Sequence, residues 1–129
     1  MKIPDNTTVF EGELATFWFD ENGILYALSK NTPRTLERQK ENYQFIKKIT
    51  GNHKVCLLCD TTNSSLQGKE TRDYSATQLP NYFHAMAVIS KSAIGKFLTN
   101  VFLKLKNQPV PITFFNNEIE AKEWLKKYL

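Results

Sequence analysis

The order of apolar and polar residues predicts how the chain begins and where its sheet is most deeply buried. Residues 10–19 alternate between two faces, one of which carries glutamates, and predict a strand with one partly exposed face. A polar turn over 20–23 leads into a second strand over 24–28, so we expect an opening β-hairpin. Residues 55–59, "VCLLC", are apolar without alternation, which is typical of a central parallel strand covered on both faces.

Helical spacing predicts the elements between and after these strands. Thr32 is expected to cap a helix that has Pro33 in its first turn, runs to about Thr50 and is closed by Gly51 and Asn52. Its buried stripe is expected to comprise Leu36, Tyr43, Ile46 and Ile49. We further predict a helix over 71–79 ended by Pro80, a strand over 85–89, a helix that begins at Ser90 or Ser92, a strand over 112–115 and a final helix capped by Asn117.

The order of the predicted elements is β-β-α-β-α-β-α-β-α, which predicts one α/β domain over residues 1–129. Crossovers through helices give a mixed, mostly parallel sheet, to which the hairpin adds an antiparallel member. The chain has 129 residues, of which 41% are hydrophobic, and this is enough to bury a core without metal ions or disulfides.

Charge and cysteine usage narrow the classes of partner and the location. The net charge is +4 with both signs spread along the chain, so we expect no nucleic-acid partner. Apolar segments as long as a signal peptide core or a membrane span are absent, and we expect a cytoplasmic protein without an integral membrane segment. Cys56 and Cys59 would occupy opposite faces of the predicted strand, which favours two buried side chains over a redox or metal site. No metal and no cofactor is expected.

Catalytic chemistry has little support in the sequence. Neither a nucleophile paired with a histidine nor a glycine-rich phosphate loop is recognisable. Glu11 and Glu13 could form an acid–base pair on the first strand, but an exposed sheet face is the favoured interpretation. His84, directly before a strand, is interpreted as structural or solvated. We therefore do not expect an enzyme.

The C-terminal part of the chain carries the clearest resemblance to a known family. A strand "AMAVIS" is followed by an amphipathic helix "SAIGKFLTNVFLKL", a proline-rich turn, "ITFF" and "NNEIEAKEWLKKYL". Together with the element order, this resembles the STAS domain, the fold of bacterial anti-sigma-factor antagonists, and more closely the SpoIIAA-like (STAS/SEC14-like) small proteins. The resemblance covers nearly the whole chain and implies a bacterial, non-catalytic binding or regulatory module, with a protein partner or a second copy of itself as the first expectation.

The first candidate site follows the central strand, at Asp60, Thr61 and Thr62. STAS antagonists have Asp-Ser-Ser-Gly here, and the resemblance implies a phosphoacceptor at Thr61 or Thr62, although the glycine is absent and a loop over 63–70 intervenes. From the residues alone, the same side chains satisfy backbone groups in a turn or contact a ligand at the strand end. Lys91 and Ser92, at the start of a later helix, are expected on the same sheet edge and would suit an anion.

The second candidate site is the apolar stripe of that later helix, which comprises Phe97, Val101, Phe102 and Leu105. Lysines border this stripe, so it could be a core helix, a dimer or partner face, or the wall of an apolar or lipid ligand pocket. The runner-up function is therefore a carrier of a small apolar or lipid ligand, as the SEC14-like side of the resemblance implies. A phosphorylation-switched antagonist comes third.

Overall fold

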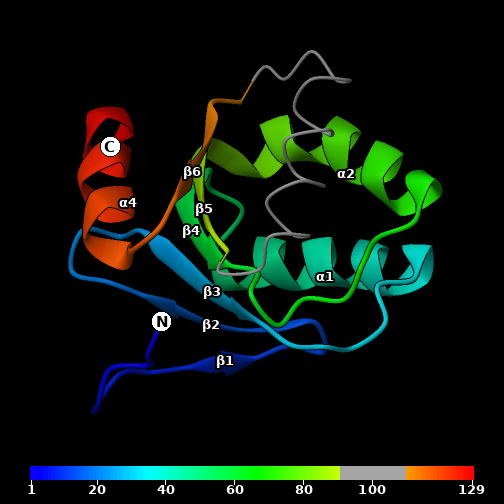
Figure 1. Ribbon diagram of the computed structural model, residues 1–129, viewed down its shortest axis with the longest axis horizontal. Helices are drawn as coiled ribbons and strands as arrows, with labels where there is room; N and C mark the ends of the chain where they lie inside the picture. The colour runs from blue at the N-terminus through cyan, green and yellow to red at the C-terminus, as the bar shows by residue number, and fades with distance from the viewer. Residues whose placement is uncertain (91–109) are drawn as a thin grey trace.

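The structure is a computed structural model, and it describes residues 1–90 and 110–129. Figure 1 shows a sheet with helices on both of its faces. The elements are β1 (Phe10–Glu11), β2 (Ala15–Phe19), β3 (Leu25–Ser29), α1 (Leu36–Ile49), β4 (Val55–Asp60), α2 (Lys69–Tyr82), β5 (Phe83–Ile89), β6 (Ile112–Phe115), α4 (Glu118–Leu125) and the 3₁₀ helix η1 (Lys126–Tyr128).

The strands form one six-stranded sheet in which their spatial order follows the chain, β1-β2-β3-β4-β5-β6. β1, β2 and β3 pair antiparallel, whereas β3, β4, β5 and β6 pair parallel. α1 and α2 are the connections between consecutive parallel strands. The predicted α/β class, with a mixed, mostly parallel sheet, is confirmed, and β4 is the central parallel strand that its continuous apolar run predicts.

Two apolar clusters lie on opposite faces of the sheet. α1 and α2 cover one face, and α4 covers the other (Figure 1). We call them the α1/α2 cluster and the α4 cluster. The α1/α2 cluster includes Phe17, Ala27, Tyr43, Ile46, Cys59 and Val88. The α4 cluster includes Trp18, Ile24, Cys56, Leu58, Ala87 and Leu125. Consecutive strand residues alternate between the clusters, which explains why the interior strands are apolar on both faces.

The first predicted strand, over 10–19, is wrong in its extent. The structure divides it into β1 and β2, which pair antiparallel with Phe10 opposite Phe17. The N–H of Gly12 donates to the Ala15 carbonyl at 2.9 Å and closes the turn between them. The face that was predicted to be partly exposed is so: Glu11 and Glu13 are exposed, whereas Phe17, only 2% exposed, is buried in the α1/α2 cluster.

The start of α1 also differs from the prediction. Its N-cap is Thr35, whose hydroxyl accepts a hydrogen bond from the N–H of Arg38, and not Thr32. Thr32 instead donates from its hydroxyl to the Glu13 carbonyl at 2.9 Å, and so ties the loop to the β1–β2 turn. Gln39 faces the interior together with the predicted Tyr43 and Ile46. The buried stripe predicted from the sequence therefore omitted Gln39, a polar residue on the buried face of α1.

α2 continues past the position at which the sequence predicts its end. Pro80 lies inside the helix, which runs to Tyr82 and passes directly into β5. The proline lacks an N–H, but the last turn still closes because the N–H of Phe83 donates to the Leu79 carbonyl. α4 begins as predicted, with the Asn117 side chain accepting from the N–H of Glu120 at 2.9 Å. The helix predicted to start at Ser90 or Ser92 falls on residues outside those described.

Candidate functional site

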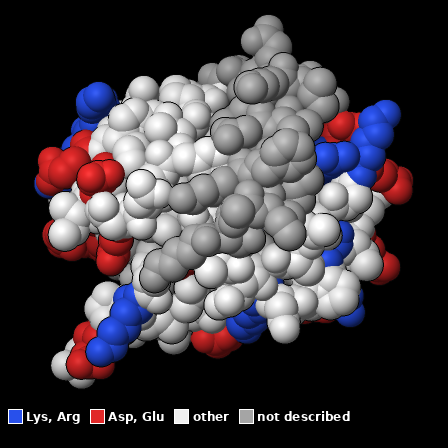
Figure 2. Space-filling model, viewed as in Figure 1, with Lys and Arg blue, Asp and Glu red and all other residues white. Residues whose placement is uncertain are grey.

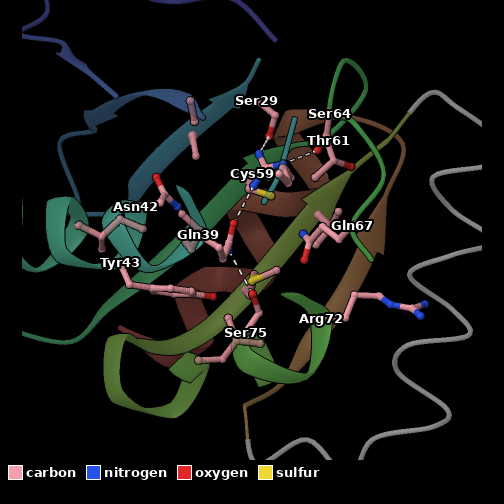
Figure 3. Close-up of a pocket in the computed structure, with 18 of the residues that line it drawn as sticks. Ser29, Gln39, Asn42, Tyr43, Cys59, Thr61, Ser64, Gln67, Arg72 and Ser75 are labelled. Atoms are coloured by element: carbon pink, nitrogen blue, oxygen red, sulfur yellow. Dashed lines mark hydrogen bonds between the residues drawn. The ribbon is translucent and has the colours of Figure 1, made fainter. Parts of the chain in front are cut away.

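A cavity of about 220 Å³ lies between the sheet and the helices α1 and α2. Its wall is mainly apolar and comes from β2, β3, β4 and β5 together with both helices. Members of this wall include Phe17, Ala27, Ile46, Leu57, Leu79 and Val88. Figure 3 shows polar side chains running through the cavity, from Ser29 and Ser64 past Gln39 to Ser75. The interior of the α1/α2 cluster thus contains both an apolar surface and a set of hydrogen-bonding groups.

Arg34 is one of two arginines among the described residues that line this cavity. Its Nε donates to the Ser64 hydroxyl at 2.8 Å, and its Nη2 donates to the Ser29 hydroxyl at 3.3 Å. Two further bonds are long, from Nη1 to Gln39 Oε1 and from Nη2 to the Leu14 carbonyl, both at 3.4 Å. Arg34 precedes the N-cap of α1, and its backbone forms a parallel bridge with Gln67, so the loop before α2 helps to position it.

Gln39 and Ser75 connect the two helices across the cavity. Gln39 is 4% exposed, and its Nε2 donates to the Ser75 hydroxyl of α2 at 3.1 Å (Figure 3). Tyr43 lies one helical turn beyond Gln39 on the same face of α1. Burial raises the pKa of the Tyr43 phenol, despite hydrogen bonds to Ser75 and Gln39 that lower it, so the ring stays neutral at physiological pH.

The charge of Arg34 has no acidic partner in the described part of the chain. All four acceptors of its hydrogen bonds are neutral. Burial lowers the pKa of the guanidinium from its ordinary value, which shows that the surroundings disfavour the charge. Residues 91–109 contain no Asp or Glu in the sequence, so they supply no carboxylate either. Charges removed from water are normally paired, whereas this partly buried guanidinium donates its hydrogen bonds to hydroxyl, amide and carbonyl groups.

Cys59 also lines the cavity, where burial favours its neutral thiol form. Burial raises the pKa of its thiol to about 12, although Arg34 lowers it, so the thiolate is not populated near neutral pH. Cys56 belongs to the α4 cluster, on the opposite face of β4. Both cysteines are free and buried. The predicted placement of the two sulfur atoms on opposite faces is therefore confirmed.

The structure separates the predicted site at the end of β4. Asp60 is 3% exposed and points to the α4 face, where its Oδ2 pairs with the Met1 ammonium at 3.1 Å. Burial raises the pKa of Asp60, but hydrogen bonds from Thr62 and from this ammonium outweigh it, so the pKa lies below its usual range. Thr61 lies on the cavity side and donates from its hydroxyl to the Ile89 carbonyl at 3.3 Å. Thr62 donates its N–H to Asp60 Oδ1 at 3.0 Å, which is the turn geometry expected for an Asp at that place.

The other predicted site residues fall on the part of the chain that is not described. These residues are Lys91, Ser92, Phe97, Val101, Phe102 and Leu105. The anion site at the helix start and the apolar ligand or dimer face therefore stay predictions.

The described residues concern three alternative sites: an acid–base pair, a histidine site and a metal site. Glu11 pairs with Lys30 at 2.9 Å and Glu13 pairs with Arg38 at 2.6 Å, so the two carboxylates have separate cations and do not face each other as an acid–base pair. His84 is exposed on β5. Within residues 1–90 and 110–129, no three His, Cys, Asp or Glu side chains gather as a candidate metal site.

Surface charge and helix length in the described residues concern two further classes of partner, nucleic acids and membranes. Figure 2 shows acidic and basic side chains side by side around the margin of the face viewed, with no broad region of one sign among its described atoms. None of the described helices is long and apolar enough to cross a membrane.

Sequence reasoning missed Arg34, Gln39 and Ser75, although a signal for them was present. Gln39 lies at helical spacing from Tyr43 and Ile46, on the face that was predicted to be buried. The buried residues of α2 are Thr71, Ser75 and Leu79, so two of its three inward positions carry hydroxyls. Polar residues at buried positions of two neighbouring helices indicate a polar interior site, because each needs a partner there.

The comparisons with known proteins agree with this fold. The model of the family described as "Domain of unknown function (DUF7793)" matches residues 17–129. The chain belongs to the DUF7793 family. A solved structure similar to this DUF7793 chain is the crystal structure of an uncharacterized protein from the DUF3478 family with a SpoIIAA-like fold, from Shewanella loihica PV-4. No curated protein sequence matches the DUF7793 chain.

The similarity to the Shewanella structure concerns the fold. The two chains are 17% identical, the match covers 92% of this chain and 91% of the other, and the TM-score is 0.54. The predicted SpoIIAA-like, STAS-type fold is thereby confirmed for this DUF7793 domain. The residues around the cavity have to carry the functional argument, since one fold hosts many functions.

Proposed function

We propose that this domain is a non-catalytic binding module that holds a small, mainly apolar organic molecule in the cavity between the sheet and helices α1 and α2. The observation that carries this proposal is an apolar cavity of about 220 Å³ with a few convergent polar groups at Arg34, Gln39 and Ser75. Apolar walls with a small number of placed polar groups are the usual composition of small-molecule sites.

The cavity is partly open, and its size limits the part of a ligand that it can enclose. An engineered apolar cavity of about 150 Å³ holds benzene, so by proportion a cavity of about 220 Å³ suits roughly nine non-hydrogen atoms. This is a short-chain or single-ring molecule. A long acyl chain would need space beyond the described walls.

The lining groups argue against catalysis in the cavity. Of the described residues that line it, none is Asp, Glu or His, so its Ser and Thr hydroxyls have no general base. The raised pKa of Cys59 removes the thiolate as an alternative nucleophile. Binding without turnover is therefore the activity that the described wall supports.

A titration with a neutral probe tests this proposal. We expect 1-octanol to cause saturable shifts of backbone amide NMR signals from Ala27, Leu57 and Val88, which line the cavity. Signals from Ile24 and Leu58, in the α4 cluster, serve as the internal control and should move little. Native mass spectrometry of the freshly purified protein should show a mass excess that is lost on denaturation if a natural ligand is retained. Equal shifts in both clusters, or none in either, would contradict the proposal.

A further inference from the structure

Arg34 forms mostly long hydrogen bonds for a partly buried side chain. Three of its four hydrogen bonds have donor–acceptor distances of 3.3 to 3.4 Å, and only the bond to Ser64, at 2.8 Å, is short. Distances above about 3.2 Å are at the weak end for N–H···O bonds. The guanidinium therefore retains hydrogen-bonding capacity toward the cavity that it lines.

A neighbouring arginine shows the ordinary arrangement. Arg38 is about one helical turn further along and pairs with the Glu13 carboxylate at 2.6 Å, with about a third of its side chain exposed. The chain thus gives a carboxylate partner to Arg38 and neutral partners to Arg34, which lines the cavity. Neither the described residues nor the sequence of 91–109 offers Arg34 an acidic side chain.

We propose, building on the binding function above, that the ligand is a small carboxylic acid with an apolar tail, and that its carboxylate is seated on Arg34. The planar guanidinium fork matches a carboxylate with two parallel hydrogen bonds. The hydroxyls of Ser29 and Ser64, which already contact Arg34, are placed to donate to the same anion after rotation. The tail then lies against Ala27, Leu57 and Val88.

The charge balance favours a monoanion over a phosphate dianion. Arg72 is the other cationic side chain among the described lining residues, and Figure 3 shows it extending away from Gln39 and Ser75. One guanidinium compensates one negative charge, whereas a dianion would leave an excess negative charge beside an apolar wall. A carboxylate therefore fits both the charge and the apolar surroundings of Arg34.

The decisive comparison uses heptanoate and methyl hexanoate, which have the same number of carbon and oxygen atoms and differ in charge. We expect the wild-type protein to bind heptanoate about tenfold or more tightly than the ester, by NMR titration or calorimetry, because a charge-assisted hydrogen bond forms only with the acid. Equal binding of the two would overturn the carboxylate proposal while leaving the binding function intact. Binding of neither, together with no binding of 1-octanol, would overturn both.

Two matched variants test whether Arg34 causes the preference for heptanoate over methyl hexanoate. Arg34→Met should abolish the preference for the acid while the ester still binds, and Arg38→Met, its neighbour on the outside of α1, should keep the wild-type preference. If Arg34→Met does not fold, the wild-type comparison and Arg34→Lys, which keeps the charge and loses the planar fork, still decide the proposal. A retained preference in a folded Arg34→Met protein would overturn it, as would binding of inorganic phosphate as tightly as heptanoate.

Discussion

The pKa of the Cys59 thiol depends on its burial in the interior of this domain. Burial holds the pKa of its thiol at about 12, compared with an ordinary value of 9.0. Between these two values the unfolded chain has lost the proton while the folded chain still binds it. The unfolded state then binds fewer protons, so the free energy of unfolding decreases as the pH rises above about 9.

The resulting prediction concerns the alkaline stability of Cys59→Ala. Between about pH 8 and about pH 10, wild-type stability should fall by about 1 kcal/mol more than that of the variant, because the variant lacks this proton linkage. Urea unfolding of both proteins at the two pH values, in reducing buffer, measures the difference. Other titrating groups are common to both proteins and cancel in the comparison. An identical fall in both would show that the folded thiol ionises normally.

Individual polar residues mark the limit of what the sequence could predict about the site. The positions of Cys56 and Cys59 followed from strand alternation alone, because their faces depend only on spacing. The role of Arg34 did not follow, since it depends on which neighbours a loop residue meets. Those neighbours, Ser29 and Ser64, come from β3 and from the loop before α2, and only the folded chain brings them together.

The β1–β2 turn is the element whose geometry depends most on one residue. A Cβ atom on Gly12 would lie 3.0 Å from the Ala15 carbonyl oxygen and 3.2 Å from a ring carbon of Phe17. The first neighbour is backbone and the second is a buried ring, so neither can move easily. By contrast, a Cβ on Gly68, before α2, meets nothing within 4 Å.

Gly12→Ala and Gly68→Ala therefore form a matched pair of substitutions. We expect Gly12→Ala to lower the free energy of unfolding by about 1–3 kcal/mol through overpacking. Gly68→Ala should stay within about 1 kcal/mol of wild type, because a small loss at the helix N-cap is offset by a less flexible unfolded chain. Thermal and urea unfolding of the two variants tests this, and similar losses in both would show that the turn is not tightly packed.

For individual helices and strands, the sequence predicted the type of element better than its first and last residues. β4 and the start of α4 were predictable because a continuous apolar run and an Asn117 cap are local signals. The turn at Gly12 was missed because residues 10–19 resemble one alternating run, whereas Phe10 and Phe17 in fact lie on the same side of the sheet. α2 was predicted to end before Pro80, but tertiary packing and the bond from Phe83 to Leu79 carry the helix further.

Introducing a larger side chain should change stability and ligand binding differently on the two faces of the sheet. Ala27 lines the cavity on the α1/α2 side, whereas Ala87 is fully buried in the α4 cluster. We expect Ala27→Leu to fill part of the cavity, to change stability by less than about 1 kcal/mol and to abolish binding of 1-octanol.

Ala87→Leu is the control on the closed face. It should cost about 1–3 kcal/mol of stability because no space receives the added carbons, and it should leave ligand binding intact. Unfolding measurements and the NMR titration on both variants make the comparison. Equal destabilisation by the two substitutions would mean that the cavity closes up in solution.

The sequential strand order has a consequence for how the chain is made. Each strand pairs with the one synthesised just before it, so the sheet can grow at the ribosome without waiting for distant segments. α1 and α2 emerge before α4, the described helix that covers the other face. Ala121 and Leu125 can join Trp18 and Leu58 in the α4 cluster only after α4 has left the exit tunnel. The nascent chain thus passes through a stage at which α1 and α2 have emerged and α4 has not. At this stage the α4 side of the sheet exposes apolar surface that chaperones can bind.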